Sequence, residues 1–117
     1  MLGNDRLAGG SVIVNADPRQ VRNATVYVRL EDVSRVDAPS RIVAEQVLSG
    51  GAFAEGQPLR FELRGVLPGG SGSCRLRVHV DVDGDGQVSP GDYVSTESYP
   101  VTPSTAQTDI EVRVHRV

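Results

Sequence analysis

Residues 81–92 carry the amino-acid types and the spacing of a cation-binding loop. The segment reads DVDGDGQVSPGD and places aspartates at its first, third, fifth and twelfth positions. A calcium ion takes about six to eight oxygen ligands, so a chain that wraps around it must present oxygens from alternating positions. Glycine at position six, Gly86, permits the sharp turn that such a loop needs. We therefore predict a calcium site formed by side-chain oxygens of Asp81, Asp83, Asp85 and Asp92, by the backbone carbonyl of Gln87, and by Ser89, which would act directly or through a water.

The last ligand of this loop departs from the usual pattern, because Asp92 stands where a longer glutamate normally binds the ion with both oxygens. We expect weaker binding as a result, with a dissociation constant of about 10⁻⁵ to 10⁻³ M. Such an ion would brace the ends of two strands. The alternative is that Asp-Gly-Asp-Gly is hairpin-turn chemistry alone, since Asp-Gly pairs supply the positive φ angles of tight connections.

Charge and composition favour a small globular domain whose acidic excess lies in this loop. The chain has 15 acidic and 12 basic residues, and without the four loop aspartates the balance is 11 to 12. A pI near 5.3 argues against a nucleic-acid-binding protein. Cys74 is the single cysteine, so no internal disulfide can form. The sequence contains no apolar run long enough for a membrane span, and no apolar signal segment or lipid-attachment cysteine near Met1.

Alternating apolar and polar residues predict an all-β domain. In residues 58–64, Leu59, Phe61 and Leu63 share one face, and charged residues occupy the other. Residues 41–48 fit a strand or a short helix, and we favour the strand. After a flexible tail at residues 1–10, one domain at 11–117 is expected to be an antiparallel β-sandwich of about seven strands. The expected strands are residues 11–16, 24–33, 41–48, 58–64, 74–82, 92–101 and 108–117.

The same alternation places the acidic loop between two strands, which excludes a helix-loop-helix EF-hand. In residues 74–82 it puts Val80 and Val82 in the core, with His79 and Asp81 outward. His79 and His115 are therefore predicted to be solvated surface histidines. Arg60, Arg64, Arg75 and Arg77 also face outward, and ordinary ion pairs between strands explain them better than a surface for an acidic partner. No nucleophile, base and acid arrangement is recognisable, so we expect no enzymatic activity.

Four segments resemble a bacterial family of small lipoproteins grouped with type III secretion lipoprotein chaperones. They are ATVYVRLEDVSRVDAP at residues 24–39, RIVAEQ at 41–46, PLRFELR at 58–64 and YPVTP at 99–103. The resemblance implies a compact β-sandwich in the periplasm or cell envelope, and in a few members a chaperone or pilot role for an outer-membrane secretion component. The loop at residues 81–92 is more elaborate than the plain turn that this resemblance implies.

Two functions follow from these observations. The first is a non-enzymatic calcium-binding module of the bacterial cell envelope, in which the ion braces a loop that connects two strands. The alternative is a secretion-type lipoprotein chaperone or pilot that holds a protein partner on a sheet edge or outer face, with the loop only a turn.

Overall fold

The computed structural model of the chain describes residues 6–15, 17–21, 23–33, 41–54, 56–65, 74–97, 99–102 and 109–117. Part of the expected tail, residues 1–5, and much of the family-like segment, residues 34–39, lie outside these described residues.

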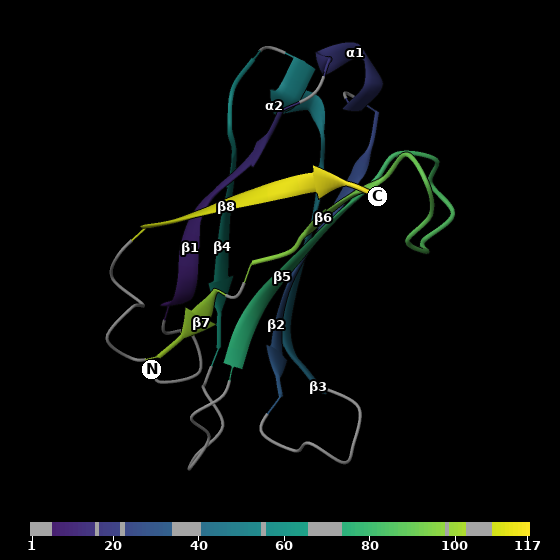
Figure 1. Cartoon of the computed structure of the whole chain (residues 1–117). Helices are drawn as coiled ribbons and strands as arrows, with labels where there is room; N and C mark the ends of the chain where they lie inside the picture. The colour runs from purple at the N-terminus through teal and green to yellow at the C-terminus, as the bar shows by residue number, and fades with distance from the viewer. Residues whose placement is uncertain are drawn as a thin grey trace.

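The described residues confirm the all-β class (Figure 1). Two helices of four residues, α1 (Pro18–Val21) and α2 (Gly51–Ala54), are the helical elements of this part of the chain, and neither is long enough to cross a membrane. The strands are β1 (Arg6–Val14), β2 (Thr25–Asp32), β3 (Arg41–Ser49), β4 (Leu59–Arg64), β5 (Cys74–Asp81), β6 (Tyr93–Ser95), β7 (Pro100–Val101) and β8 (Asp109–Arg116).

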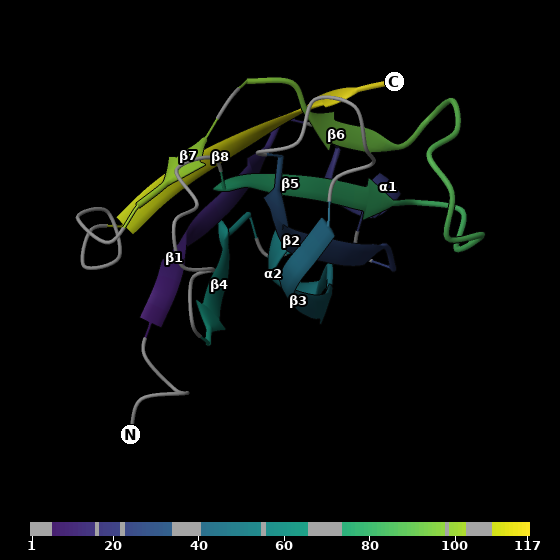
Figure 2. The same cartoon turned by 90° about the horizontal axis from the view of Figure 1, so that it is seen from below.

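All of these strands join one sheet in place of the two sheets expected for a sandwich. The strand order is β3-β2-β5-β6-β8-β1-β4, and β7 pairs with β5. The pairs are antiparallel except β1 and β8, which run parallel. The sheet curls until its end strands face one another, and Gln46 Oε1 on β3 accepts a hydrogen bond of 2.9 Å from the Glu62 N–H on β4. The result is a nearly closed barrel, which Figure 2 shows from below.

Several strand boundaries differ from the prediction. The regular alternation of β2 and β4 matches the expected strands closely, and residues 41–49 are a strand and not a helix. In contrast, β1 begins at Arg6, so residues 6–10 are part of the sheet and not of a tail. The single strand expected at residues 92–101 is two short strands, β6 and β7.

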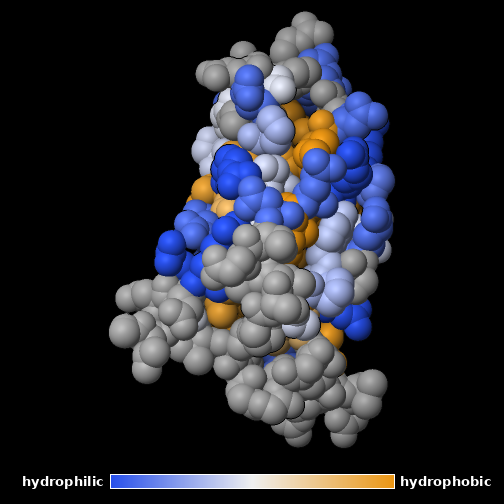
Figure 3. Space-filling view, turned by 90° about the vertical axis from the view of Figure 1, so that its left-hand side faces the viewer, coloured by the Kyte–Doolittle hydropathy of each residue, from blue (hydrophilic) through white to orange (hydrophobic). Residues whose placement is uncertain are grey.

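The hydrophobic core fills the inside of the curled sheet. Its largest fully buried side chains include Leu30 on β2, Leu63 on β4 and Leu76 on β5. On the face that Figure 3 shows, hydrophilic residues cover most of the coloured surface, and hydrophobic residues show in smaller areas among them. The parallel pair of β1 and β8 depends on Gly10, since a Cβ built there would lie 1.9 Å from the Ile110 carbonyl oxygen.

Three of the four outward-facing arginines form ion pairs, and two of these pairs, those of Arg60 and Arg77, join different strands as predicted. Arg77 Nε on β5 lies 3.3 Å from Glu31 on β2, which joins neighbouring strands. Arg60 reaches Asp109 across β1, and Arg64 pairs with Glu62 on its own strand. Since these side chains are exposed, each such pair contributes little to stability.

Candidate functional site

The acidic loop connects β5 to β6 and extends from one end of the sheet (Figure 1). Asp81 is the last residue of β5, and Asp92 comes directly before β6. The two strands are neighbours, since His79 pairs with Val94 and Val80 with Tyr93. The first and last acidic residues of the loop are therefore held by the sheet itself.

Asp81 organises the first half of the loop. Its Oδ1 accepts a hydrogen bond of 3.1 Å from the Gly84 N–H, and its Oδ2 accepts one of 2.7 Å from the Gly86 N–H. Both glycines have positive φ angles, of 76° and 77°, which a residue with a Cβ rarely adopts. The Asp-Gly-Asp-Gly sequence thus folds the backbone around the Asp81 carboxylate.

Asp83 and Asp85 are exposed and shape the loop through bonds to nearby groups. Asp85 Oδ1 accepts a hydrogen bond of 2.9 Å from the Gln87 N–H, and the Ser89 hydroxyl donates one of 2.9 Å to Asp83 Oδ2. The bond from Ser89 is the main cause that lowers the pKa of Asp83 below its ordinary value. Asp83 therefore keeps the charge that a cation ligand needs to a lower pH than an ordinary aspartate would.

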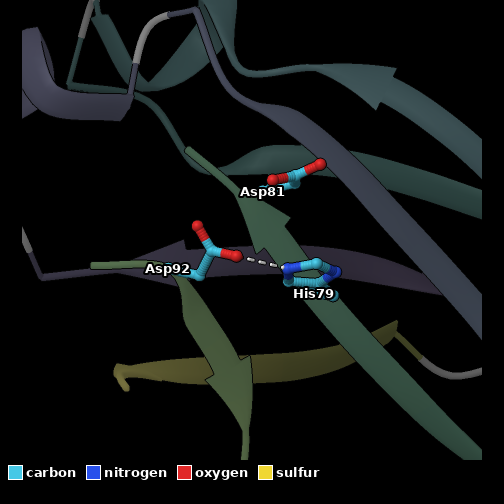
Figure 4. A group of neighbouring side chains, drawn as sticks. All are labelled: His79, Asp81 and Asp92. Carbon is cyan, nitrogen blue, oxygen red and sulfur yellow. Dashed lines mark hydrogen bonds and ion pairs between the residues drawn. The ribbon is translucent and has the colours of Figure 1, made fainter. Parts of the chain in front are cut away.

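Asp92 is the buried anchor of the second half of the loop, with 1% of its surface exposed. Its Oδ1 accepts a hydrogen bond of 2.9 Å from the Val82 N–H, and its Oδ2 accepts one of 3.2 Å from the Ser89 N–H. His79 Nε2 lies 2.8 Å from the same Oδ2 (Figure 4). Burial is the largest single influence and raises the pKa of Asp92, but the bonds from His79, Val82 and Ser89 together lower it below its ordinary value.

The prediction that His79 is a solvated surface residue was wrong. His79 is 8% exposed, because the loop returns over the outer face of β5 and places Asp92 against the imidazole. Asp81 is also buried and not outward in water, and Val82 is only half-buried. His115 is exposed, as expected. Sequence alternation assigns a residue to a face of a strand, but it does not reveal what covers that face.

The loop brings together the four predicted carboxylate ligands. One oxygen from each of Asp81, Asp83, Asp85 and Asp92 lies within 4.8 Å of the others. Ser89 lies beside them, since its hydroxyl donates a hydrogen bond to Asp83 Oδ2. Gln87 contacts the group through its N–H, which donates to Asp85 Oδ1, whereas its carbonyl was the predicted ligand atom. A set of carboxylates and a hydroxyl fits a hard cation such as calcium. His79 forms a second group with Asp81 and Asp92, and a nitrogen ligand also suits zinc or other transition metals.

Sequence reasoning missed a stack of planar side chains that connects this loop to the edge of the sheet. The Arg29 guanidinium lies 4.9 Å from the centre of the Tyr27 ring, and that ring stacks on His79 at 5.7 Å between centres. Arg29 also forms an ion pair with Glu45 on β3. The register, in which Tyr27 lies opposite both Val47 and His79, is the tertiary information that the sequence pattern lacks.

The protein belongs to the all-β class and is built on one curled, mixed sheet. Its structure is similar to the solved structure of an alternative pilotin from the type II secretion system of Vibrio cholerae. The TM-score is 0.66 at 23% sequence identity, and the match covers 94% of this chain and 96% of that chain. At this identity the likeness shows the fold.

The sequence identifies the family. Residues 5–114 match the family described as type III secretion system lipoprotein chaperone (YscW), and the chain belongs to this family. The resemblance noted in the sequence is thereby confirmed. No curated protein matches the chain.

Proposed function

We propose that this chain is a non-enzymatic chaperone or pilot protein of the bacterial cell envelope, which binds an outer-membrane component of a protein secretion system. The observation that carries the proposal is the family match over residues 5–114. The pilotin fold of the solved relative, which is a type II secretion protein, agrees with it. The outer face of the sheet carries exposed side chains that such a partner could contact.

The test of this function is direct binding. The purified chain is mixed with the purified outer-membrane component of the type II or type III secretion system encoded in the same genome. We expect a stable complex in size-exclusion chromatography, with a micromolar or tighter dissociation constant by calorimetry. An unrelated outer-membrane protein in the same detergent is the control. If the secretion component binds no better than this control, the proposed function is wrong.

We also propose that the loop binds one calcium ion, with Asp81, Asp83, Asp85, Gln87, Ser89 and Asp92 as ligands. The grouping of the four carboxylates within 4.8 Å supports this second proposal. Like charges at such distances repel one another by about 1 kcal/mol per pair even in water, and a bridging cation removes that cost. The role of the ion would be structural. When the free calcium concentration is a hundredfold above the dissociation constant, binding adds about 2.7 kcal/mol to the free energy of unfolding.

Thermal unfolding with and without calcium tests the second proposal. Millimolar calcium should raise the melting temperature of the metal-free protein, and the double change Asp83→Asn with Asp85→Asn should abolish the increase. Glu97→Gln is the matched control, since Glu97 is exposed and lies outside the loop. An unchanged melting temperature in the unmodified protein would show that the loop is a turn and not an ion site.

A further inference from the structure

The inner end of the acidic loop holds a group of side chains that differs from the calcium ligand set by one nitrogen. His79 and Asp81 belong to the end of β5, and Asp92 comes directly before β6 (Figure 4). One ligand atom from each of the three lies within 4.8 Å of the others. The group therefore presents an imidazole nitrogen and two carboxylates to a single ion.

Burial distinguishes this group from the outer part of the loop. Asp81 and Asp92 are each 1% exposed and His79 is 8% exposed, whereas Asp83 and Asp85 are exposed. The three are among only four polar or charged residues that are buried in the described part of the chain. Exposed carboxylates are solvated by water, but buried charges are costly unless a counter-charge lies beside them.

The counter-charge that this group lacks is positive. Within the described residues no arginine forms an ion pair with Asp81 or Asp92, and the pair between His79 and Asp92 is the one they make. Even a protonated imidazole would leave one of the two carboxylates without a counter-charge. Backbone N–H groups bond both carboxylates but supply no full charge. A divalent cation would balance both carboxylates while His79 stays neutral.

The distances suit a transition metal. Zinc binds imidazole nitrogen and carboxylate oxygen at about 2.0 to 2.2 Å, so two ligands of one ion lie about 3.0 to 3.5 Å apart. His79 Nε2 and Asp92 Oδ2 are 2.8 Å apart and are joined by a hydrogen bond. An ion in place of the bonded proton requires these two atoms to separate by less than about 1 Å. The neutral imidazole would then bind through Nε2 and carry its proton on Nδ1.

Groups outside the ligand set already hold the three ligands in place. The Tyr27 ring stacks on the His79 imidazole at 5.7 Å between centres. The Val82 N–H bonds Asp92 Oδ1, and the Gly86 N–H bonds Asp81 Oδ2. Each of these oxygens keeps a second lone pair that an ion can use. Support of this kind fixes the orientation of metal ligands and strengthens metal binding.

We propose that His79, Asp81 and Asp92 form a site for a divalent transition metal such as zinc, with water completing the coordination. The nitrogen ligand favours such a metal over calcium, which takes oxygen ligands. The site shares two carboxylates with the proposed calcium site, so the loop holds one of the two ions at a time. The inference goes beyond the proposed functions, because it requires neither a secretion partner nor bound calcium.

A zinc titration of the complete chain is the first test. Protein freed of metal with EDTA, and then of EDTA, is titrated with zinc chloride by calorimetry, and we expect a dissociation constant of about 10 µM or tighter. His79→Gln keeps an amide that can donate to Asp92 but removes the nitrogen ligand, so it should weaken zinc binding by about tenfold or more. The control is His115→Gln, which should leave the affinity unchanged, because His115 is exposed and lies outside the loop. Weaker binding by the unmodified chain, or equal affinity in His79→Gln, would overturn the inference.

Cobalt provides a readout on the unmodified chain, which does not depend on the folding of a variant. An imidazole bound to paramagnetic Co²⁺ gives strongly shifted proton signals in the NMR spectrum, including that of its exchangeable N–H. We expect the signals of one bound imidazole in the unmodified chain and in His115→Gln, and their loss in His79→Gln. If Co²⁺ binds and no imidazole signals are shifted, the ion has only oxygen ligands and the proposed site is wrong.

The outcomes separate this site from the proposed calcium site. The rise of the melting temperature with calcium should persist in His79→Gln, because His79 is not among the calcium ligands. If calcium causes no rise but zinc binding depends on His79, the calcium site is wrong and the transition-metal site stands. If calcium acts as proposed and zinc binding does not depend on His79, the calcium site stands and the transition-metal site is wrong.

Discussion

Removing the Asp92 carboxylate should destabilise the metal-free protein more than removing any other acid of the loop. In Asp92→Ala, the Val82 N–H, the Ser89 N–H and His79 Nε2 all lose their acceptor. A donor left unpaired in a buried place costs about 1 to 3 kcal/mol. The bonds of the Val82 and Ser89 N–H groups are only part-buried, so each of these losses is about 1 kcal/mol, and with the buried His79 the three sum to about 3 to 5 kcal/mol.

Relief of charge repulsion offsets part of this cost. The Asp92 carboxylate has an oxygen within 4.8 Å of those of the other three loop acids. At that distance each repulsion is worth about 1 kcal/mol or less in water, and salt screens it further. We therefore expect a net loss of about 2 to 3 kcal/mol in the free energy of unfolding, a large share of the 5 to 15 kcal/mol typical of a domain.

Urea unfolding in the presence of EDTA measures this loss without interference from bound ions. The matched control is Asp85→Ala, because Asp85 is exposed and its Gln87 N–H partner can bond water instead. The control should lie within about 0.5 kcal/mol of the unmodified protein. A loss below about 0.5 kcal/mol in Asp92→Ala itself would refute the view that Asp92 anchors the loop through His79 and the backbone.

Two further predictions concern the sheet and its acid sensitivity. Gly10→Ala should lower the free energy of unfolding in urea by about 3 kcal/mol or more, because the new Cβ would lie 1.9 Å from the Ile110 carbonyl oxygen of β8. The control is Gly56→Ala, where φ is 73° and no atom lies within 4 Å of the new Cβ, and it should cost only about 1 to 2 kcal/mol. Equal losses in the two variants would contradict the close approach of β1 and β8. Asp92 and Asp109 have lowered pKa values, so the stability they contribute is present above about pH 4 and is lost as the pH falls through their folded-state pKa values. The free energy of unfolding measured in urea should fall from pH 7 to pH 2, and it should fall less in Asp109→Asn. If this variant and the unmodified protein give the same pH profile, Asp109 does not contribute to the acid sensitivity.

The sequence predicts individual strands where side chains alternate strictly. In β4 the order Leu59, Arg60, Phe61 leaves one possible face for the core, and the structure agrees. In β1 the segment from Leu7 to Gly10 is buried throughout, so no alternation marks its beginning. Small residues there let neighbouring strands approach closely, which is a requirement of the assembled sheet and not of the isolated segment.

The arrangement of the strands could not be read from the sequence in the same way. Alternation assigns faces, but it does not say which strand lies beside which. The parallel pairing of β1 with β8 joins the two ends of the described chain, from Gly9 opposite Asp109 to Val14 opposite Val114. This long-range pair makes one curled sheet from strands that would equally suit two stacked sheets.

The candidate site shows the same division between local and tertiary information. Spacing alone predicted that four aspartates would gather, because the ligand positions of a twelve-residue loop are a local property. The burial of His79 required the loop to fold back onto β5, and Tyr27 reaches the imidazole only because β2 is the neighbour of β5. The imidazole contacts both the Tyr27 ring and the Asp92 carboxylate, so it joins the acidic loop to the outer face of the sheet. A change in the loop that displaces Asp92 would therefore remove a hydrogen bond that fixes the His79 imidazole beside the Tyr27 ring.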